Sequence, residues 1–86
     1  MKMATCGTYE SNDCFVTVMP QKTGRTIQIE SIVFSSFGAQ IQAVIEGILE
    51  ELHLDNIAIA IQDKGALDYT IRARVLTALQ RAGVSL

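Results

Sequence analysis

Hydrophobic and polar residues alternate in two short stretches of the first half of the chain. Residues 14–19 (Cys-Phe-Val-Thr-Val-Met) are dense in residues that favour strands, and this stretch ends at Pro20. Residues 26–30 alternate polar with apolar side chains, as a strand buried on one face does. Residues 21–24, which lie between the two stretches, have the composition of a turn. The pattern therefore predicts two strands paired as a hairpin.

A longer amphipathic pattern follows and predicts a helix. Ser35 or Ser36 can cap its beginning, and apolar residues then recur at helical spacing. These apolar residues are Phe37, Ile41, Val44, Ile45, Ile48, Leu49 and Leu52. The opposite face carries Gln42, Glu46, Glu50 and Glu51. We interpret that face as solvated charge, with docking of a basic partner as the alternative.

The last third of the chain predicts one more strand and one more helix. Residues 57–61 (Ile-Ala-Ile-Ala-Ile) place isoleucines on one face and alanines on the other, where a helix could pack closely. After a turn at residues 63–65, apolar residues recur at helical spacing from Leu67 to Ala82, and Gly83 ends the helix. The order strand, strand, helix, strand, helix predicts an α+β fold. We expect a small two-layer sandwich in which two helices cover one face of a three-stranded sheet.

The beginning of the chain differs from the rest. Residues 1–12 show no periodicity and are rich in small and polar residues, so we expect a flexible leader there. We expect residues 13–86 to form a single α+β domain. A domain of this size is too small for a second core or a deep catalytic cleft. The chain is therefore expected to be a component of a larger system and not a complete enzyme.

Composition narrows the classes of partner. Hydrophobic residues make up 49% of the 86 residues and charged residues 19%, which is an ordinary globular balance. A net charge of -2 disfavours a nucleic-acid binder, which needs concentrated Lys and Arg. No apolar run approaches the roughly 20 residues that span a bilayer, and the first residues lack a signal-peptide pattern. We expect a soluble, cytoplasmic protein with neither nucleic acid nor membrane as a partner.

The residues that commonly bind metals are few. Cys6 and Cys14 lack the close spacing of a redox pair or a zinc site, and His53 is the only histidine. We therefore predict no metal site. We interpret both cysteines as small apolar side chains in a reducing cytosol.

Ser11 is the candidate functional residue. It lies in the polar stretch of residues 7–13, directly before the first predicted strand. A hydroxyl on a mobile loop, with Glu10 and Asp13 nearby, suits covalent attachment of a group, because the attaching enzyme must bring a bulky donor up to the backbone. The simpler interpretation is a serine that forms hydrogen bonds within a turn.

Three segments taken together resemble a known family. They are Gly7-Thr8-Tyr9-Glu10-Ser11, the Phe37-Gly38 pair, and the run Asp63-Lys64-Gly65-Ala66-Leu67-Asp68-Tyr69-Thr70-Ile71-Arg72-Ala73-Arg74-Val75. Over nearly its whole length the chain resembles the acyl carrier protein, or gamma subunit, of bacterial citrate lyase. The related acyl carrier subunit of malonate decarboxylase is similar and is the alternative within the same class.

The resemblance implies that Ser11 holds 2'-(5''-phosphoribosyl)-3'-dephospho-coenzyme A through a phosphodiester. The thiol of this arm would carry an acetyl group, which the alpha subunit exchanges for citrate, and the beta subunit would cleave the citryl thioester to oxaloacetate. The implied partners are these two subunits, the prosthetic-group transferase (holo-carrier synthase) and the acetylating ligase. The chain itself would be a carrier with no catalytic residue.

An alternative from another class is a non-catalytic adaptor whose sheet or acidic helix only binds a partner protein.

The charged residues in and near the last predicted helix allow two interpretations. Asp68 and Arg72 have the spacing of a surface ion pair on a helix. A sharper hypothesis is that Lys64, Arg74 or Arg81 contacts the phosphates of the arm or acidic groups on a partner.

Overall fold

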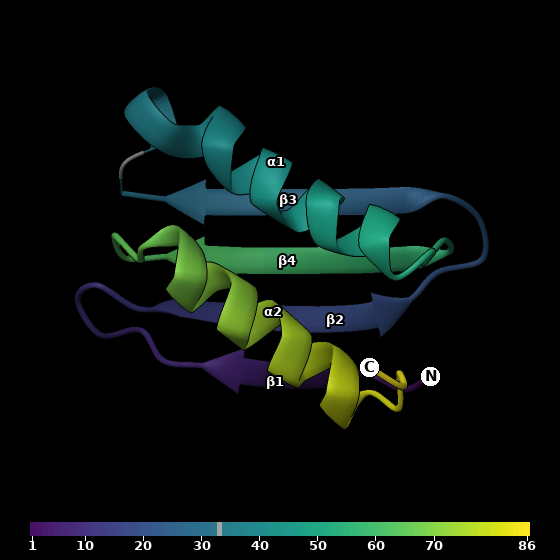
Figure 1. Cartoon of the computed structure of the whole chain (residues 1–86). Coiled ribbons are helices and arrows are strands. Elements are labelled where there is room, and N and C mark those ends of the chain that lie inside the picture. The colour runs from purple at the N-terminus through teal and green to yellow at the C-terminus, as the bar shows by residue number, and fades with distance from the viewer. Residues whose placement is uncertain (33) are drawn as a thin grey trace.

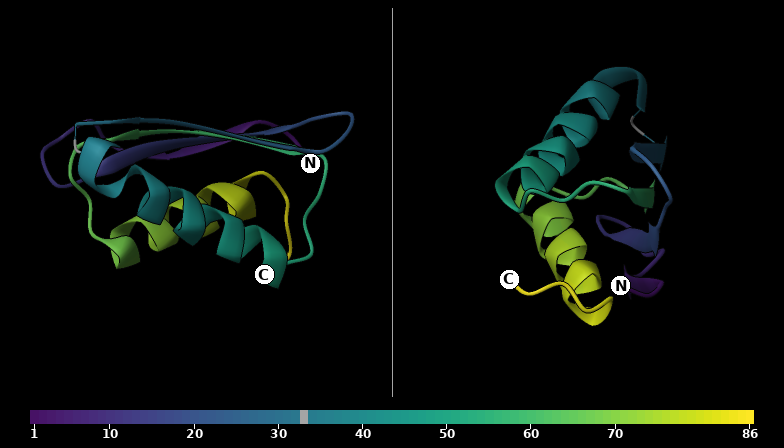
Figure 2. Two further views of the ribbon diagram at one scale, coloured as in Figure 1. Left: turned by 90° about the horizontal axis from the view of Figure 1, so that it is seen from above. Right: turned by 90° about the vertical axis from the view of Figure 1, so that its right-hand side faces the viewer.

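The computed structural model describes residues 1–32 and 34–86 and has two layers (Figures 1 and 2). One layer is a four-stranded sheet in the order β1-β2-β4-β3, and the other consists of two helices. The elements in chain order are β1 (Ala4–Gly7), β2 (Cys14–Pro20), β3 (Arg25–Ser31), α1 (Phe34–Glu51), β4 (Ile57–Asp63) and α2 (Asp68–Arg81). Both helices pack on the same face of the sheet, as Figure 2 shows. The predicted α+β sandwich with two helices on one face is confirmed.

The expected three-stranded sheet is wrong, because β1 adds a fourth strand. Residues 4–7 lie in the segment that the sequence assigned to a flexible leader, and they pair antiparallel with β2. Cys6 lies opposite Val16 in this pairing, and both side chains are buried. A four-residue strand is too short to display a period of its own, so only its packing against α2 and β2 defines it.

The predicted hairpin between β2 and β3 is also wrong, because β4 lies between them. β4 runs antiparallel to β2 and parallel to β3. Ile57, Ile59 and Ile61 of β4 are fully buried, whereas alternate residues of β3 are exposed. The most apolar strand therefore occupies the centre of the sheet, where burial is greatest, and β3 takes an edge.

The core lies between the sheet and the helices. The isoleucines of β4 face α1 and α2, and Ala58 and Ala60 lie on the other face of the sheet, which neither helix covers. Ile45 and Leu49 of α1 and Leu79 of α2 are fully buried against them. Burying side chains of this size contributes about 1.5–3 kcal/mol each, which is what holds the helices on this face. None of the described helices is long and apolar enough to cross a membrane.

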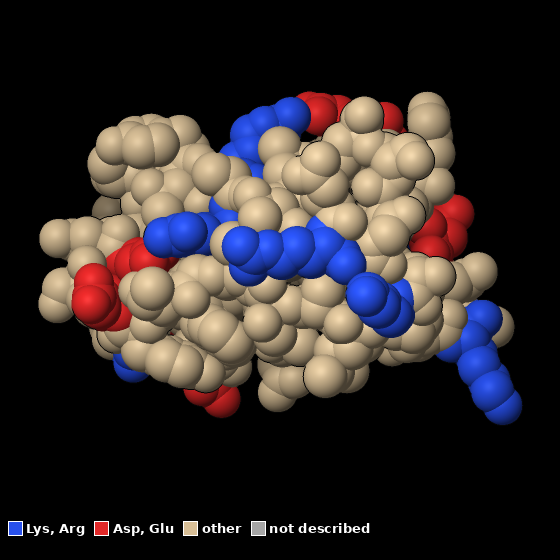
Figure 3. Space-filling view, turned by 90° about the horizontal axis from the view of Figure 1, so that it is seen from below, with Lys and Arg blue, Asp and Glu red and all other residues tan. Residues whose placement is uncertain are grey.

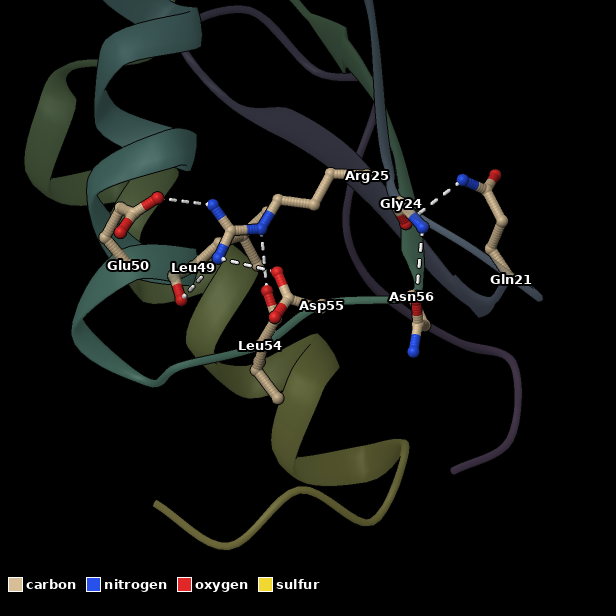
Figure 4. Close-up of polar contacts among 8 residues, drawn as sticks. All are labelled: Gln21, Gly24, Arg25, Leu49, Glu50, Leu54, Asp55 and Asn56. Carbon is tan, nitrogen blue, oxygen red and sulfur yellow. Dashed lines mark hydrogen bonds and ion pairs between the residues drawn. The ribbon is translucent and has the colours of Figure 1, made fainter.

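Arg25 fixes one end of the sandwich (Figure 4). Its Nε donates to the Leu54 carbonyl at 2.7 Å, and its Nη1 bonds Glu50 at 2.6 Å. Its Nη2 lies 3.3 Å from Asp55. These contacts join the start of β3 to the segment that leaves α1. Figure 1 shows the β2–β3 connection at this end and the β1–β2 connection at the opposite end.

Candidate attachment site

Ser11 lies at the tip of the loop of residues 8–13, which joins β1 to β2. The Asp13 amide donates to the Glu10 carbonyl at 3.2 Å, which closes a tight turn around Ser11 and Asn12. Asn12 has a positive φ of 66°, a conformation that asparagine tolerates in turns. The Ser11 side chain is exposed, and among the described residues its hydroxyl has no hydrogen-bond partner. The oxygen is therefore accessible to an incoming group.

The Asp13 carboxylate holds this loop together. It accepts hydrogen bonds from the Thr8 hydroxyl at 2.6 Å and from the Cys14 amide at 2.7 Å. The guanidinium of Arg74, on α2, approaches the same carboxylate with Nε at 3.0 Å and Nη2 at 2.8 Å. This two-point geometry is the strong form of an ion pair and also fixes the relative orientation of the two side chains. The loop is thus attached to α2.

The Asp13–Arg74 pair is charged over the whole physiological range. The Arg74 guanidinium and then the Thr8 hydroxyl hold the pKa of Asp13 well below its usual value. The same hydrogen bond to Asp13 raises the pKa of Arg74. A carboxylate that is saturated in this way is a structural anchor and is not available as a proton acceptor for chemistry at Ser11.

A second brace comes from the connection between β4 and α2. The Asn12 amide donates to the Lys64 carbonyl at 2.8 Å, and the Lys64 amide donates to the Asp13 carbonyl at 2.9 Å. Asp63 is buried and shapes this connection, because its carboxylate accepts from the amides of Gly65 at 3.2 Å and Ala66 at 2.9 Å. Ser31 also donates to Asp63, at 2.8 Å. The predicted turn at residues 63–65 therefore supports the Ser11 loop.

The geometry explains the residue types before Ser11. Gly7 has a φ of 114°, and a Cβ at this position would overlap the Cys14 carbonyl oxygen, so only glycine fits. The Thr8 hydroxyl also accepts a bond from the Glu10 amide at 3.2 Å. The Tyr9 ring stacks on Phe15 of β2 at a centroid distance of 4.8 Å. Each residue from Gly7 to Glu10 thus contributes to the conformation that presents Ser11.

Comparison with known proteins identifies the family. A family model described as "ACP: Malonate decarboxylase delta subunit" matches residues 1–82. A citrate lyase acyl carrier protein of Treponema denticola is 47% identical over 79 residues, which cover 92% of this chain and 90% of that protein. One of Lacticaseibacillus casei is 48% identical and covers 92% of this chain and 78% of that protein. This chain belongs to the acyl carrier protein family of citrate lyase and malonate decarboxylase. As a member, it is a carrier subunit and not itself a catalyst.

The fold of the acyl carrier protein also has a counterpart among solved structures. A chain in the crystal structure of a Pseudomonas malonate decarboxylase hetero-tetramer in complex with malonate superposes with a TM-score of 0.84. It is 24% identical in sequence, and the match covers 95% of this chain and 84% of that one. The similarity establishes that the two chains share a fold.

The basic residues of the carrier are used in different ways. Arg74 bonds Asp13, and Arg81 Nη1 donates to the Thr5 carbonyl of β1 at 2.9 Å. Arg72 pairs with Glu51 of α1 at 2.8 Å and not with Asp68, as its spacing had suggested. Viewed from the side of β1 and α2, basic side chains form a row across the carrier (Figure 3). Two residues of α2, Arg74 and Arg81, both contact groups on the β1–β2 side of the sheet.

The two cysteines of the carrier are buried and unpaired, which agrees with their interpretation as small apolar side chains. Burial and then the negative charges of Asp13 and Asp63 raise the pKa of the Cys14 thiol to about 12. Among the described residues, no group of three or more His, Cys, Asp or Glu side chains is arranged to hold a metal ion. Of the candidate groups, Ser11 is the exposed nucleophilic oxygen that the fold presents at a loop tip.

Proposed function

We propose that the chain carries acyl groups for citrate lyase on a covalent arm attached to Ser11. The arm is 2'-(5''-phosphoribosyl)-3'-dephospho-coenzyme A, joined to the serine oxygen by a phosphodiester. The observation that carries the proposal is the exposed hydroxyl at the tip of a loop that the Thr8–Asp13 hydrogen bond holds in shape. The identity of 47–48% to citrate lyase acyl carrier proteins supports the choice of system.

The residues around Ser11 fit such a group. The arm is bulky and anionic, and an exposed loop tip accepts it without displacing any packed side chain. Lys64 adjoins Asn12 and Asp13 through backbone hydrogen bonds. Its ammonium group can meet the phosphates, while Arg74 remains committed to Asp13 and Arg81 to the Thr5 carbonyl. When bound, the arm supplies a thiol that forms the thioester, a chemistry that the side chains of this chain do not offer.

The protein part of the carrier contributes position. The alpha subunit exchanges the bound acetyl group for citrate, and the beta subunit cleaves the citryl thioester. A tether holds the thioester near both sites at an effective concentration of order millimolar, provided that its length spans them. The loop fixed by Asp13 and Arg74 also presents Ser11 to the prosthetic-group transferase, and the acetylating ligase recharges the thiol.

Intact-mass analysis of the natively purified citrate lyase complex tests the attachment. We expect the wild-type carrier to show a large adduct that maps to the peptide containing Ser11. Ser11→Ala should lose both the adduct and citrate cleavage while its circular dichroism and melting temperature are unchanged. Ser85→Ala, which removes an exposed serine near the other end of the chain, is the matched control and should retain the adduct. An adduct that persists in Ser11→Ala would contradict the proposal.

A second candidate is the carrier subunit of malonate decarboxylase, which the matching family model and the fold of the Pseudomonas chain favour. The two candidates differ in the substrate whose turnover requires the modified chain. Adding the modified carrier to the carrier-depleted enzymes should restore cleavage of citrate. Restored decarboxylation of malonate in place of citrate cleavage would select the second candidate. A native complex that contains only the unmodified chain would favour a non-catalytic adaptor.

A further inference from the structure

A groove of about 450 Å³ lies between the start of α1 and the connection from β4 into α2. Exposed apolar side chains surround it: Phe37 is 52% exposed, Leu67 59% and Tyr69 72%. Ile32, 68% exposed, lies next to Gly65 in the groove wall, with its Cδ1 3.8 Å from the position of a Cβ on that glycine. Large apolar groups gathered around one concave site on a small protein mark a binding surface.

This groove adjoins the Ser11 loop. Gly65 lines the groove, and the position of a Cβ on Gly65 lies 3.6 Å from the Asn12 side-chain oxygen. The preceding residue, Lys64, exchanges backbone hydrogen bonds with Asn12 and Asp13. Figure 1 shows the β1–β2 loop, the β4–α2 connection and the start of α1 at the same end of the sandwich. A group attached to Ser11 therefore begins next to the wall of the groove.

The charge of the lining selects what can enter. Two carboxylates, Asp63 and Asp68, line the groove, and none of its described lining residues is basic. Asp63 is buried and saturated by hydrogen bonds, whereas Asp68 is exposed and accepts a bond from Gln40 at 2.8 Å. Phosphates and a citryl group are anionic and are repelled here. The groove therefore suits an uncharged, flat and partly apolar part of the arm.

We propose that this groove binds the adenine ring of the arm, an inference that rests on the proposed attachment at Ser11. Adenine is neutral and planar, so it can stack on the exposed rings of Tyr69 and Phe37. The Gln40 amide and the Asp68 carboxylate offer a donor and acceptors to its polar edge. The chemical order of the arm agrees, because the phosphoribosyl unit on Ser11 is joined directly to the adenosine, whereas the thiol lies at the far end.

The site does not need high intrinsic affinity. A tethered ring has an effective concentration of order millimolar, so a millimolar dissociation constant already fills the groove about half of the time. Binding the ring beside Ser11 leaves the diphosphate and the thiol-bearing part of the arm outside the groove. The groove thus shortens the part of the arm that moves and keeps the thioester available to partners.

Nuclear magnetic resonance of the full modified chain, isolated from the native complex, tests this inference. We expect cross-peaks between the adenine H2 and H8 protons and the rings of Tyr69 and Phe37. Amide shifts relative to Ser11→Ala should extend to Gly65 and Leu67. Tyr69→Ala should weaken binding of the ring about fivefold or more, given the usual strength of base stacking, so that the bound fraction falls from about one half to about one sixth or less. Leu86→Ala, which truncates an exposed apolar side chain that neither lines the groove nor belongs to the Ser11 loop, is the control and should keep the cross-peaks.

Intact-mass analysis distinguishes failure of the proposed function from failure of this inference alone. A native carrier with no adduct on Ser11 overturns both the proposed function and this inference. An adduct on Ser11 whose adenine signals stay as narrow as those of a free nucleotide, with shifts confined to residues 10–12, overturns the inference alone. If Tyr69→Ala weakens assembly with partner subunits and leaves the adenine signals unchanged, the groove is a protein-docking surface and the inference is likewise overturned.

Discussion

Arg74 on α2 bonds both carboxylate oxygens of Asp13, a residue 61 positions earlier in the chain. The pair connects the loop that presents Ser11 with the helix that covers β1 and β2. The Asp13 carboxylate also accepts hydrogen bonds from the Thr8 hydroxyl and the Cys14 amide. This one carboxylate therefore accepts several of the hydrogen bonds that define the loop. The conformation of the attachment loop therefore depends on a helix that is distant in sequence.

Removing the Arg74 side chain should destabilise the fold and disturb the loop. We expect Arg74→Ala to lower the free energy of unfolding by about 1–2 kcal/mol, because it leaves a well-bonded carboxylate without its charged partner. Arg74→Lys should recover only part of this, since an ammonium cannot form the two-point contact. Urea denaturation measures the effect. Arg72→Ala is the control: its pair with Glu51 is more exposed and should contribute less than about 1 kcal/mol. Equal losses in the two variants would contradict the assigned role.

The Asp13 pair also predicts how stability depends on pH. The pKa of Asp13 is lowered in the folded state, so the folded state favours the ionised carboxylate and its contribution is complete above the ordinary aspartate pKa of about 4. As the pH falls below that value, the contribution declines, and it is lost below the folded-state pKa. The stability difference between wild type and Asp13→Asn should therefore be constant from about pH 7 to 5 and shrink towards pH 3. Urea denaturation across this range measures it, and a difference that does not change with pH would exclude this mechanism.

Gly7 should be intolerant of any side chain. Gly7→Ala places a Cβ onto the Cys14 carbonyl oxygen and also forces a left-handed backbone on alanine. We expect a loss of about 3 kcal/mol or more, because β1 and β2 must move apart locally. Gly24→Ala is the matched control, since Gly24 also has a positive φ but nothing lies within 4 Å of the added atom. It should cost about 1 kcal/mol from backbone strain alone. Similar melting temperatures for the two variants would show that the overlap is relieved without cost.

Cys14 should be chemically inert in the folded chain. Its thiol is fully buried and its pKa is raised to about 12, so the reactive thiolate is scarce at pH 8. We expect no alkylation of Cys14 by iodoacetamide in the native chain and complete alkylation in urea, measured by peptide mass. Alkylation at the same rate in both conditions would show that the thiol is accessible.

The sequence predicted the helices and strands in which apolar residues recur at a clear helical or strand spacing. The spans of α1, α2, β2, β3 and β4 follow from apolar spacing, and the structure places them within a few residues of the predictions. β1 was missed because four residues carry too little alternation to distinguish a strand from a leader. The neighbour of β2 was assigned wrongly because β2 and β3 are adjacent in sequence, whereas burial of the three isoleucines puts β4 between them.

The candidate attachment residue could be predicted from the sequence, but the arrangement of side chains around it could not. Ser11 stood out through its polar surroundings and through the resemblance to citrate lyase carriers. From the sequence, Asp13 is only an acidic neighbour of Ser11, and Arg74 is only one of three cations that could contact phosphates. Their pairing depends on how α2 crosses the sheet, which no local pattern encodes. The groove beside Gly65 likewise forms from α1 and α2 together, which are separated by the whole of β4.

The β1–β2 hairpin, whose loop bears Ser11, limits how far a carried group could travel. Both sides of the loop are held, one by pairing with β2 and the other by α2, so the arm that we propose on Ser11 would have a stationary pivot relative to the body of the protein. Its thioester would sweep only the sphere that the arm itself reaches. Two active sites that share the cargo must therefore both lie inside that sphere, or else the whole carrier must change its docking position between one reaction and the next.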